Sequence, residues 1–593
     1  MRRVTILTLI ILVILGTAEI FAAQPPADAG AGRGGVGARG GMMGGRGGAG
    51  ARGGGGGMMG GMMGGMMGGR GGTPPAWIEE GYNDHQHMQD LLGIKALRPG
   101  KSGSNQTGPG FEEATANEWM PTMPDALTMK DGTKVTTAAQ WTKRRAEILE
   151  DFESEVYGRI PANVPKVTWE VTGTSEGTVG DVPTITKTLV GHVDNSGFPE
   201  ITVDISASFT VPANAAGPVP MFLSFGGGFS FGMNLDNNES ANTTVYAVYQ
   251  PSNGNTLFSL AAAGGDAEAG ARGGMMGGRG GAGARGGMMG GGMMGGEGGP
   301  GARGGRGGRG GGMMGGGGAN SVSNQAITHG WGYGSINPGS IQADSGGNSL
   351  RQGIIGLTNK GQPRKPDDWG ALRAWGWGVS KLIDYFEANP DSKVDPTKVS
   401  IEGVSRYGKA AIVTQAFDER VAVALVASSG EGGVKLHRHD FGEAVENLTA
   451  TSEYHWMSGN FLKYGAADIN GKSMDASDLP VDSHELIALC APRPCFISYG
   501  TEANGDPKWV DAPGSYRAGI LATKVYEVLG KKGYGSDVKD WVHEPLPPVD
   551  TLVGNDLAFR QHSQNPGHSS GGNISTFFEW IGAYIKSPAT PAN

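Results

Sequence analysis

The sequence predicts an α/β fold, a three-layer αβα sandwich around a mostly parallel central sheet. From residue 219 onwards, strand-like runs alternate with helix-like runs of about 10–15 residues, a pattern typical of parallel sheets with helices on both faces. Before residue 219, strand-like runs follow one another and alternate apolar with polar residues, which indicates antiparallel strands. These observations predict one α/β domain that begins with a β-rich antiparallel part.

The first part of the domain contains a predicted helix and four predicted strands. Residues 138–157 place Trp141, Ile148 and Phe152 on one side at helical spacing. Apolar–polar alternation predicts three strands, over 166–173, 184–193 and 200–211. Residues 219–225, VPMFLSF, predict a buried strand that runs into glycines.

The second part supplies the alternating elements. In chain order, the patterns predict a strand over 326–336, a helix over 369–388, a strand over 398–403, a helix ending at Phe417, strands over 421–430 and 493–500, and helices over 518–530 and 574–585.

The N-terminus predicts export. Residues 1–23 begin with two arginines, continue with an apolar run from Val4 to Leu15 and end with small residues, the composition of a signal peptide. The apolar run is shorter than the roughly 20 residues that a membrane-spanning helix needs. We expect a secreted or periplasmic protein without an integral membrane span after cleavage; a retained N-terminal anchor is the alternative.

Two Gly/Met/Arg-rich tracts lie outside the predicted elements, at 29–72 and about 264–318. They nearly lack branched and aromatic side chains, so they cannot offset the entropy lost on ordering and are predicted to be disordered. We assign 24–75 to a linker and 76–593 to the folded domain, which the tract at 264–318 interrupts. RNA binding, Cu(I) binding by paired methionines and a weak surface tether are alternatives to a simple linker and loop insertion.

Composition narrows the possible partners. The formal net charge of −9 gives no indication of a nucleic-acid partner. An extended path between Cys490 and Cys495 spans about 16 Å, too far for a disulfide bond. His437 and His439 would share one face of a strand, but no further ligands follow at zinc spacing. We therefore expect no metal, no cofactor and a monomer.

The run KVSIEGVSRYGKAAI, residues 398–412, places a serine between a strand and a helix. Ser405 lies between Gly403 and Gly408, which resembles the nucleophile elbow of serine hydrolases, although the usual G-x-S-x-G is one residue shorter. A serine that only caps the helix is the alternative interpretation.

Further candidates follow in the order that a Ser–acid–His triad takes in this kind of fold. The loop after the strand at 493–500 contains Glu502, Asp506 and Asp511, and a Gly-rich loop before the last helix contains His562 and His568. Upstream, FGGGF (225–229) follows a strand and is placed to supply an oxyanion-hole amide. The combination predicts a serine hydrolase.

The stretch GVSRYGK resembles the G-x-S-R-x-G-K elbow of carbohydrate esterase family 15, the glucuronoyl esterases. Residues 131–161, 441–465, 478–494 and the GDPKW loop are also similar to bacterial members. The resemblance implies an α/β-hydrolase catalytic domain that cleaves esters of (4-O-methyl)glucuronic acid linking glucuronoxylan to lignin in plant cell walls. It implies that Ser405 is the nucleophile, His568 the general base and Arg406 the oxyanion ligand.

The same resemblance implies a set of substrate-binding side chains: Lys409, Glu446, Glu453, Trp456 and Trp509. Lys409 would hydrogen-bond the uronic acid hydroxyls, and Trp509 would cover the sugar. Surface positions for the cations and core positions for the tryptophans are the alternatives.

Three departures from fungal members matter. The position of their catalytic glutamate is Ser428 here, so we expect the acid in the later loop and favour Asp506 over Glu502. Val404 and Ser569 replace the cysteines of their disulfide, and the low-complexity insertion has no counterpart. An acetylxylan esterase and a secreted carbohydrate-binding pseudoenzyme are the alternative functions.

Overall fold

The computed structural model describes residues 75–226 and 321–588. The predicted signal peptide, nearly all of the predicted linker and the insertion at 264–318 lie outside the described residues. Within the described ranges, no helix has both the length and the apolar character needed to cross a membrane.

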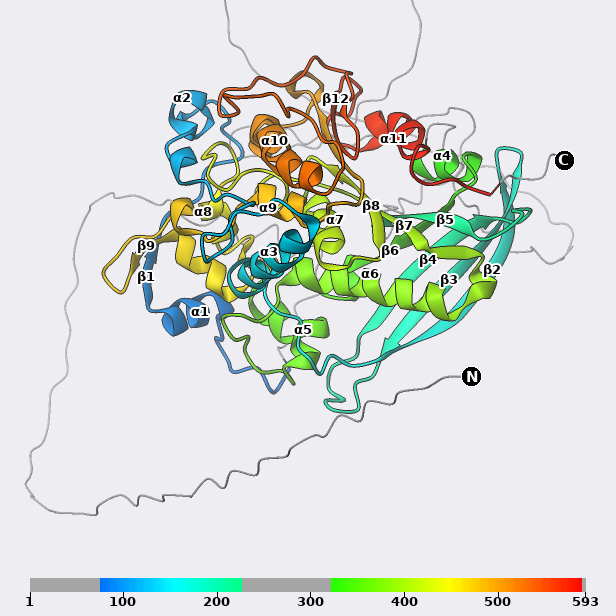
Figure 1. Ribbon diagram of the computed structural model, residues 1–593. Helices are drawn as coiled ribbons and strands as arrows, with labels where there is room; N and C mark the ends of the chain where they lie inside the picture. Colours follow the sequence, from blue (N-terminus) through cyan, green and yellow to red (C-terminus); the bar gives the residue numbers. More distant parts are fainter. Residues whose placement is uncertain (1–74, 227–320, 589–593) are drawn as a thin grey trace, which may run out of the picture. The chain divides into compact units, whose positions relative to one another are not determined.

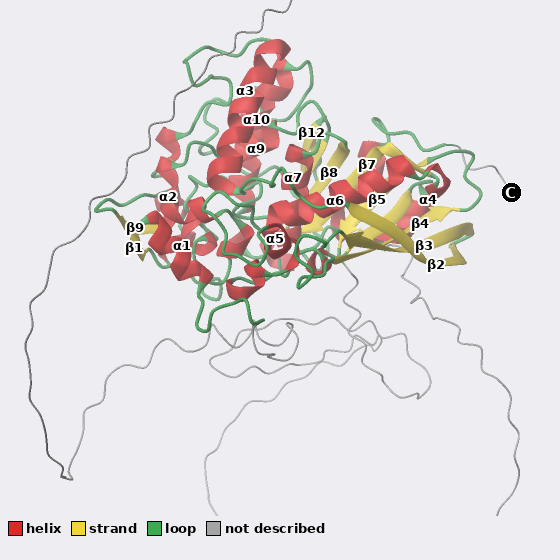
Figure 2. Cartoon of the chain, turned by 90° about the horizontal axis from the view of Figure 1, so that it is seen from below, coloured by secondary structure: helices red, strands yellow, loops and turns green. Residues whose placement is uncertain are grey.

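A ten-stranded sheet runs through the domain in the order β11-β12-β10-β8-β7-β5-β6-β4-β3-β2 (Figure 1). Its strands are β2 Val167–Val179, β3 Val182–Val193, β4 Asp204–Pro212, β5 Val219–Phe225, β6 Gly332–Ile336, β7 Val394–Val404, β8 Val421–Ala427, β10 Cys495–Gly500, β11 Val553–Gly554 and β12 Leu557–His562. The six strands from β12 to β6 pair in parallel, and the pairs beyond them are antiparallel. Figure 2 shows β2, β3 and β4 together at one end of the sheet. The predicted mostly parallel sheet with an antiparallel N-terminal part is confirmed.

Successive side chains of the central strands pack in two separate apolar clusters, because they point to opposite faces of the sheet. On β5, Met221 and Leu223 pack in one cluster, whereas Phe222 packs in the other. The first cluster takes in residues of α3 Ala138–Asp151, α6 Ala371–Ala388, α7 Arg406–Phe417, α9 Ser483–Ala488 and α10 Ala512–Val528. The second takes in α4 Val322–Thr328 and α11 Ile574–Ile581, which lie side by side in Figure 1. Helices therefore cover both faces of the sheet.

Smaller elements complete the domain. The short strands β1 Ile94–Leu97 and β9 Ala466–Ile469 form a separate antiparallel pair. The remaining α-helices of the described residues are α1 Asp84–Leu92, α2 Glu113–Ala116, α5 Gly353–Thr358 and α8 Val445–Leu448, and short 3-10 helices lie between the larger elements.

Some predicted elements are wrong in part. The predicted strand over 326–336 begins only at Gly332, because α4 occupies the preceding residues behind a Ser321 cap. The helix predicted over 138–157 ends its α-helical part at Asp151 and continues as a π-helical turn. Strand β12 was not predicted, and His562 lies at its end rather than in a loop. Short apolar runs carry too little periodicity to separate strand from helix.

The expected separation of the two cysteines is also wrong. The backbone N–H of Arg493 donates to the carbonyl of Cys490 at 3.0 Å, so the chain turns back instead of extending. As a result, the buried side chains of Cys490 and Cys495 contact each other, and both thiols are free.

Candidate active site

The carboxyl ends of four neighbouring parallel strands gather the candidate catalytic residues. Strands β12, β10, β8 and β7 are adjacent and parallel, so the segments that follow them emerge at one edge of the sheet. These segments carry, in the same order, His568, Asp506, Ser428 and Ser405. Ligands of open α/β sheets bind at this edge.

The backbone at Ser405 forms a tight elbow between β7 and α7. Ser405 has φ 60° and ψ −127°, a sparsely populated conformation that costs about 1–3 kcal/mol for a residue with a side chain. A Cβ on Gly403 would lie 2.1 Å from the Tyr407 carbonyl oxygen, and a Cβ on Gly408 2.6 Å from that of Ala427. Both glycines are therefore required. Ser405 occupies the N-cap position, but its side chain makes no capping hydrogen bond, which argues against the capping interpretation.

His568 contacts one of the predicted acids. Its Nδ1 lies 2.8 Å from Oδ1 of Asp506. The other carboxylate oxygen accepts hydrogen bonds from the Ser428 hydroxyl at 2.7 Å and from the Gly500 N–H at 2.8 Å. Asp506 is buried, whereas a third of the His568 side chain (33%) is exposed. This arrangement holds the ring by Nδ1–H and leaves Nε2 as the basic nitrogen.

The other candidate acids and the other candidate histidine lie elsewhere. The exposed Glu502 forms an ion pair with Lys508 at 3.8 Å, and Asp511 contacts His439. His562 is fully buried and contacts the carbonyl of Ser569 at 2.9 Å. Ser428, which the resemblance places at the position of the fungal acid, donates a hydrogen bond to Asp506.

Arg406 is held by a carboxylate that the sequence analysis missed. Its Nη1 donates to Oδ2 of Asp344 at 2.6 Å. The second oxygen of Asp344 accepts from Nε1 of Trp456 at 2.7 Å and contacts Nε2 of His455 at 2.9 Å. Burial raises the pKa of Asp344, but the contacts with His455, Arg406 and Trp456 outweigh it and hold this pKa well below its usual range. Asp344 follows no recognisable motif, so no sequence signal marks it.

Lys409 lies beneath the same tryptophan. The buried ammonium donates to the Ser429 carbonyl and to the Glu443 carboxylate, both at 2.7 Å. It lies 5.5 Å from the centre of the Trp456 ring, and the Arg406 guanidinium lies 5.4 Å from the same centre. Two cations therefore converge on one indole. The described residues supply acceptors for two of the three ammonium donors of Lys409 and leave the third without one.

Glu453 is a carboxyl side chain close to Lys409 and Arg406. Burial and the nearby Glu443 raise the pKa of Glu453 to about 8, while Lys409 and Arg406 oppose the rise. Within the described ranges, its buried Oε2 has no hydrogen-bond partner. The raised pKa favours the protonated form of the Glu453 carboxyl group, which keeps unused hydrogen-bonding capacity within the described residues.

The other two predicted substrate-binding residues are placed differently. Glu446 forms an ion pair with Arg98 at 2.8 Å, and Glu443, three residues earlier, is the carboxylate that contacts Lys409. The carbonyl of Trp509 accepts from the N–H of Glu443 at 2.9 Å, which brings Trp509 to the same segment. Glu443 was not among the predicted site residues, although it lies in the FGEAVENL stretch that contains the predicted Glu446.

The predicted oxyanion turn is described only at its start. The N–H of Gly226 donates to the Ile336 carbonyl at 3.1 Å, and residues 227–229 lie outside the described residues.

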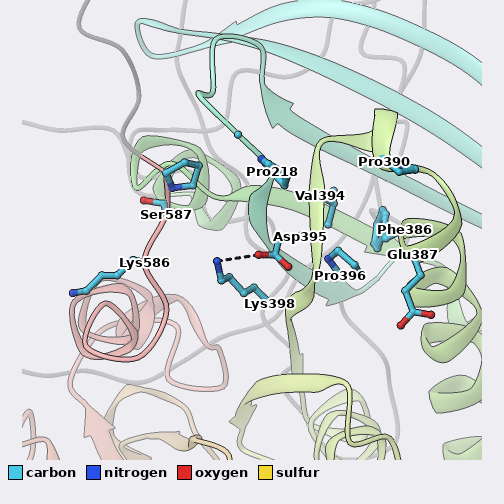
Figure 3. A pocket seen from close by; sticks show the side chains of 12 residues that line it. Pro218, Phe386, Glu387, Pro390, Val394, Asp395, Pro396, Lys398, Lys586 and Ser587 are labelled. Atoms are coloured by element: carbon cyan, nitrogen blue, oxygen red, sulfur yellow. Dashed lines mark ion pairs between the residues drawn. The ribbon is translucent and has the colours of Figure 1, made fainter. Parts of the chain in front are cut away.

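A cavity of about 580 Å³ lies away from these residues (Figure 3). It opens at the amino ends of β5 and β7, the opposite ends from the elbow, and Pro218 and Val394 line it. An ion pair between Lys398 and Asp395, at 2.9 Å, crosses it. In its lining, the Ser587 hydroxyl donates to the His329 carbonyl and the Lys586 ammonium to the Gly582 carbonyl, so these two side chains do not act as a nucleophile and its base.

His437 and His439 each contact a carboxylate, Glu431 and Asp511 respectively. In the part of the chain that the structure describes, no group of three or more His, Cys, Asp or Glu side chains could hold a metal ion.

Known proteins share this arrangement of sequence and fold. The family model for fungal glucuronyl esterases matches residues 364–530, which include the elbow and the Asp506 loop. A carbohydrate esterase from an unknown prokaryotic organism is 30% identical over 459 residues, covering 77% of this chain and 88% of the relative. The solved structure of a glucuronoyl esterase of carbohydrate esterase family 15 from Teredinibacter turnerae is 31% identical, covers 84% of this chain and 98% of that chain, and superposes with a TM-score of 0.64. The chain belongs to carbohydrate esterase family 15. The 4-O-methyl-glucuronoyl methylesterase 1 of Wolfiporia cocos is 35% identical over a shorter region, 32% of this chain and 45% of the relative. This family 15 member accordingly has the α/β-hydrolase fold and is a carboxylic ester hydrolase.

Proposed function

We propose that this family 15 esterase hydrolyses esters between the C6 carboxyl of (4-O-methyl)glucuronic acid and an alcohol, including those that join glucuronoxylan to lignin. The His568–Asp506 contact at the strand edge that also carries the Ser405 elbow supports this proposal most directly. We further propose that residues 1–23 export the enzyme, since its polymeric substrate lies outside the cell.

The reaction follows from the two groups at this edge. The Ser405 hydroxyl attacks the ester carbonyl while Nε2 of His568 takes its proton. The tetrahedral intermediate then collapses, and His568 returns the proton to the departing alcohol. A water molecule, deprotonated by His568, attacks the acyl-enzyme, and Ser405 leaves with that proton as the uronic acid is released. Asp506 keeps the ring in the required tautomer throughout.

Arg406 stabilises the negative charge that develops on the carbonyl oxygen. A guanidinium has five N–H donors, so the contact of Nη1 with Asp344 leaves others for the oxyanion. Asp344 fixes the orientation of the guanidinium, and preorganised donors of this kind stabilise a tetrahedral oxyanion more effectively than water does.

The sugar lies against the cluster around Trp456. Lys409 offers its remaining N–H and the neutral carboxyl of Glu453 offers an O–H, so both donate to ring hydroxyls of the uronic acid. Trp509 supplies an apolar face for the ring. Glu446 remains a candidate for contact with the sugar, and its ion pair with Arg98 would hold the carboxylate in place.

Replacing the nucleophile tests the proposal. We expect Ser405→Ala to lower the hydrolysis of methyl or benzyl glucuronate by about 10⁴-fold or more, since triad residues act as a unit. Alcohol release measures the rate, and the melting temperature checks that the variant is folded. A variant that keeps most of the rate would remove Ser405 from the mechanism.

Release of acetate from xylan without alcohol release from glucuronate esters would favour the acetylxylan esterase. A wild type that neither hydrolyses these esters nor reacts with a fluorophosphonate would be the pseudoenzyme.

A further inference from the structure

A second carboxylate lies just behind the nucleophile. Glu402 is on β7, three residues before Ser405, and is only 5% exposed. Its strand pairs with β5 on one side and β8 on the other, so the side chain is at the centre of the sheet. Burial raises the pKa of Glu402, and among the described residues no Lys, Arg or His forms an ion pair with it. Burying a carboxyl group without a nearby cation costs folding free energy, so the hydrogen bonds that Glu402 accepts are the interactions that can offset this cost.

Both oxygens of Glu402 accept hydrogen bonds from serines on other parts of the active site. The Ser224 hydroxyl donates to Oε2 at 2.6 Å, and the Ser570 hydroxyl donates to Oε1 at 2.5 Å. Ser224 is on β5, directly before Phe225 and the start of the glycine-rich turn. Ser570 is buried and lies two residues after His568.

The Ser570 contact differs from the other contacts of the histidine loop. The N–H of Gly567 donates to the Asn504 carbonyl at 2.6 Å, and the Ser569 carbonyl contacts His562. These bonds tie the loop to β10 and β12, the side of the sheet that carries the acid. In the described part of the chain, the bond from Ser570 to Glu402 is the hydrogen bond that ties residues 567–573 to β7, the strand of the nucleophile.

We propose that Glu402 is a positioning residue that holds the nucleophile strand, the strand of the glycine-rich turn and the histidine loop in register. The proposal rests on the proposed esterase mechanism and adds a residue that does not touch the substrate. Its carboxyl group sets where His568 lies relative to Ser405, while Asp506 sets how the ring is turned. Since a misplacement of about 1 Å can cost about 10²-fold in rate, a weak tie at this point affects catalysis more than stability.

Single-hydroxyl variants test the proposal with a matched control on the same strand. Ser570→Ala removes the bond to the histidine loop, and Ser224→Ala removes the bond to β5. Ser400 lies on β7 two residues before Glu402, is fully buried, and has no hydrogen-bond partner in the described ranges. Ser400→Ala therefore removes a buried hydroxyl from β7 without breaking a tie.

The readout is the rate at which a fluorophosphonate labels Ser405, measured beside kcat and KM for methyl glucuronate. We expect Ser570→Ala to lower both the labelling rate and kcat by about 10- to 100-fold, with KM little changed. We expect Ser400→Ala to match the wild type and Ser570→Thr, which keeps the hydroxyl, to recover most of the rate. Glu402→Gln replaces one of the two acceptor oxygens by an amide nitrogen and so weakens the ties to Ser224 and Ser570. We expect it to lower the rates similarly, and adding Ser570→Ala should lower them little further, because the two changes affect the same tie.

Labelling separates this proposal from the choice of substrate. Equal labelling and kcat in Ser570→Ala, Ser400→Ala and the wild type would overturn the positioning role of Glu402. A wild type that is labelled but does not cleave glucuronate esters would overturn the proposed substrate and leave the labelling comparison valid. A wild type that is not labelled would overturn both.

Discussion

The His568–Asp506 pair and the His439–Asp511 pair share one contact but differ in their surroundings. In each, Nδ1 of the ring contacts an aspartate oxygen, at 2.8 Å for His568 and 2.5 Å for His439. The His568 side chain is 33% exposed, whereas the His439 side chain is fully buried. The second nitrogen of His439 already faces Glu113 and Arg517, and Asp511 also caps α10.

The difference shows what turns a histidine–carboxylate pair into a catalytic one. The carboxylate orients both rings in the same way, so orientation alone does not distinguish them. Both ring nitrogens of His439 contact buried or partly buried side chains, and through them His439 connects the segment before β9 to α10. Among residues 75–226 and 321–588, Nε2 of His568 has no hydrogen-bond partner, and it lies at the edge of the sheet where the Ser405 elbow emerges, which makes general-base chemistry possible.

Removing each imidazole gives the largest expected contrast. We expect His568→Ala to lower kcat on methyl glucuronate by about 10⁴-fold with little change in the melting temperature. We expect His439→Ala to lower the melting temperature, because it leaves Asp511 buried without its partner, while the folded fraction keeps its kcat. Activity per folded molecule, from parallel activity and thermal-unfolding measurements, checks both. Equal losses of kcat would show that exposure does not separate the two pairs.

Neutralising each aspartate gives a smaller contrast. Asp506→Asn keeps the shape of the side chain but favours the wrong tautomer of His568, so we expect a loss of about 10³-fold in kcat with KM nearly unchanged. Asp511→Asn keeps an N-cap side chain for α10 and should leave kcat within about twofold. Steady-state kinetics on the same ester measures both variants. Should Glu502→Gln, at the alternative acid, reduce kcat as much as Asp506→Asn, the assignment of the acid would be wrong.

The smallest expected effect is a change in the pH profile. The pKa of Glu453 is raised to about 8 by burial and by Glu443, against the opposing charges of Lys409 and Arg406, with Asp344 adding to the rise. The Glu453 carboxyl group can donate its O–H only while it is protonated, and it loses that proton as pH rises through about 8. We therefore expect kcat/KM of the wild type to fall above this pH. Because the folded-state pKa lies above the unfolded value, the stability from this group is present at low pH and is lost as pH rises through about 8.

Glu453→Gln keeps a neutral donor, and we expect it to remove this alkaline fall while lowering kcat/KM by no more than about tenfold at pH 7. The buried Glu485, next to Arg144, has a pKa that burial also raises to about 8, so Glu485→Gln is the matched control. It should change the pH dependence of the melting temperature but not that of kcat/KM. An unchanged alkaline limb in Glu453→Gln would remove Glu453 from substrate binding.

Much of the fold was predictable because its signals are local. The buried strand at 219–225 coincides with β5, and the long amphipathic helix at 369–388 differs from α6 by two residues at its start. The elbow was recognisable because Gly403 and Gly408 meet backbone atoms within a few residues or on the next strand. Strand β12 was missed because its six residues carry both apolar and polar side chains without clear alternation.

The supporting side chains of the site were not predictable in the same way. Asp344 contacts a residue 62 positions away, and Glu402 contacts one 168 positions away. No spacing rule connects residues at such separations. Glu443 contacts Lys409 from 34 positions away, and although the stretch around it was recognised, no local pattern marked this glutamate.

The sequence by itself determined most of the order of the strands and helices along the chain, the serine elbow and the candidates for acid and base, because periodicity, glycines and motif order act over short distances. Only the tertiary structure decided which of several aspartates, glutamates and histidines meet. The parallel sheet brings the ends of β12, β10, β8 and β7 to one edge, and burial then separates an open His568 from a closed His439. Long-range packing decides which acid and which histidine meet, since the chemistry of a side chain does not depend on its position along the chain.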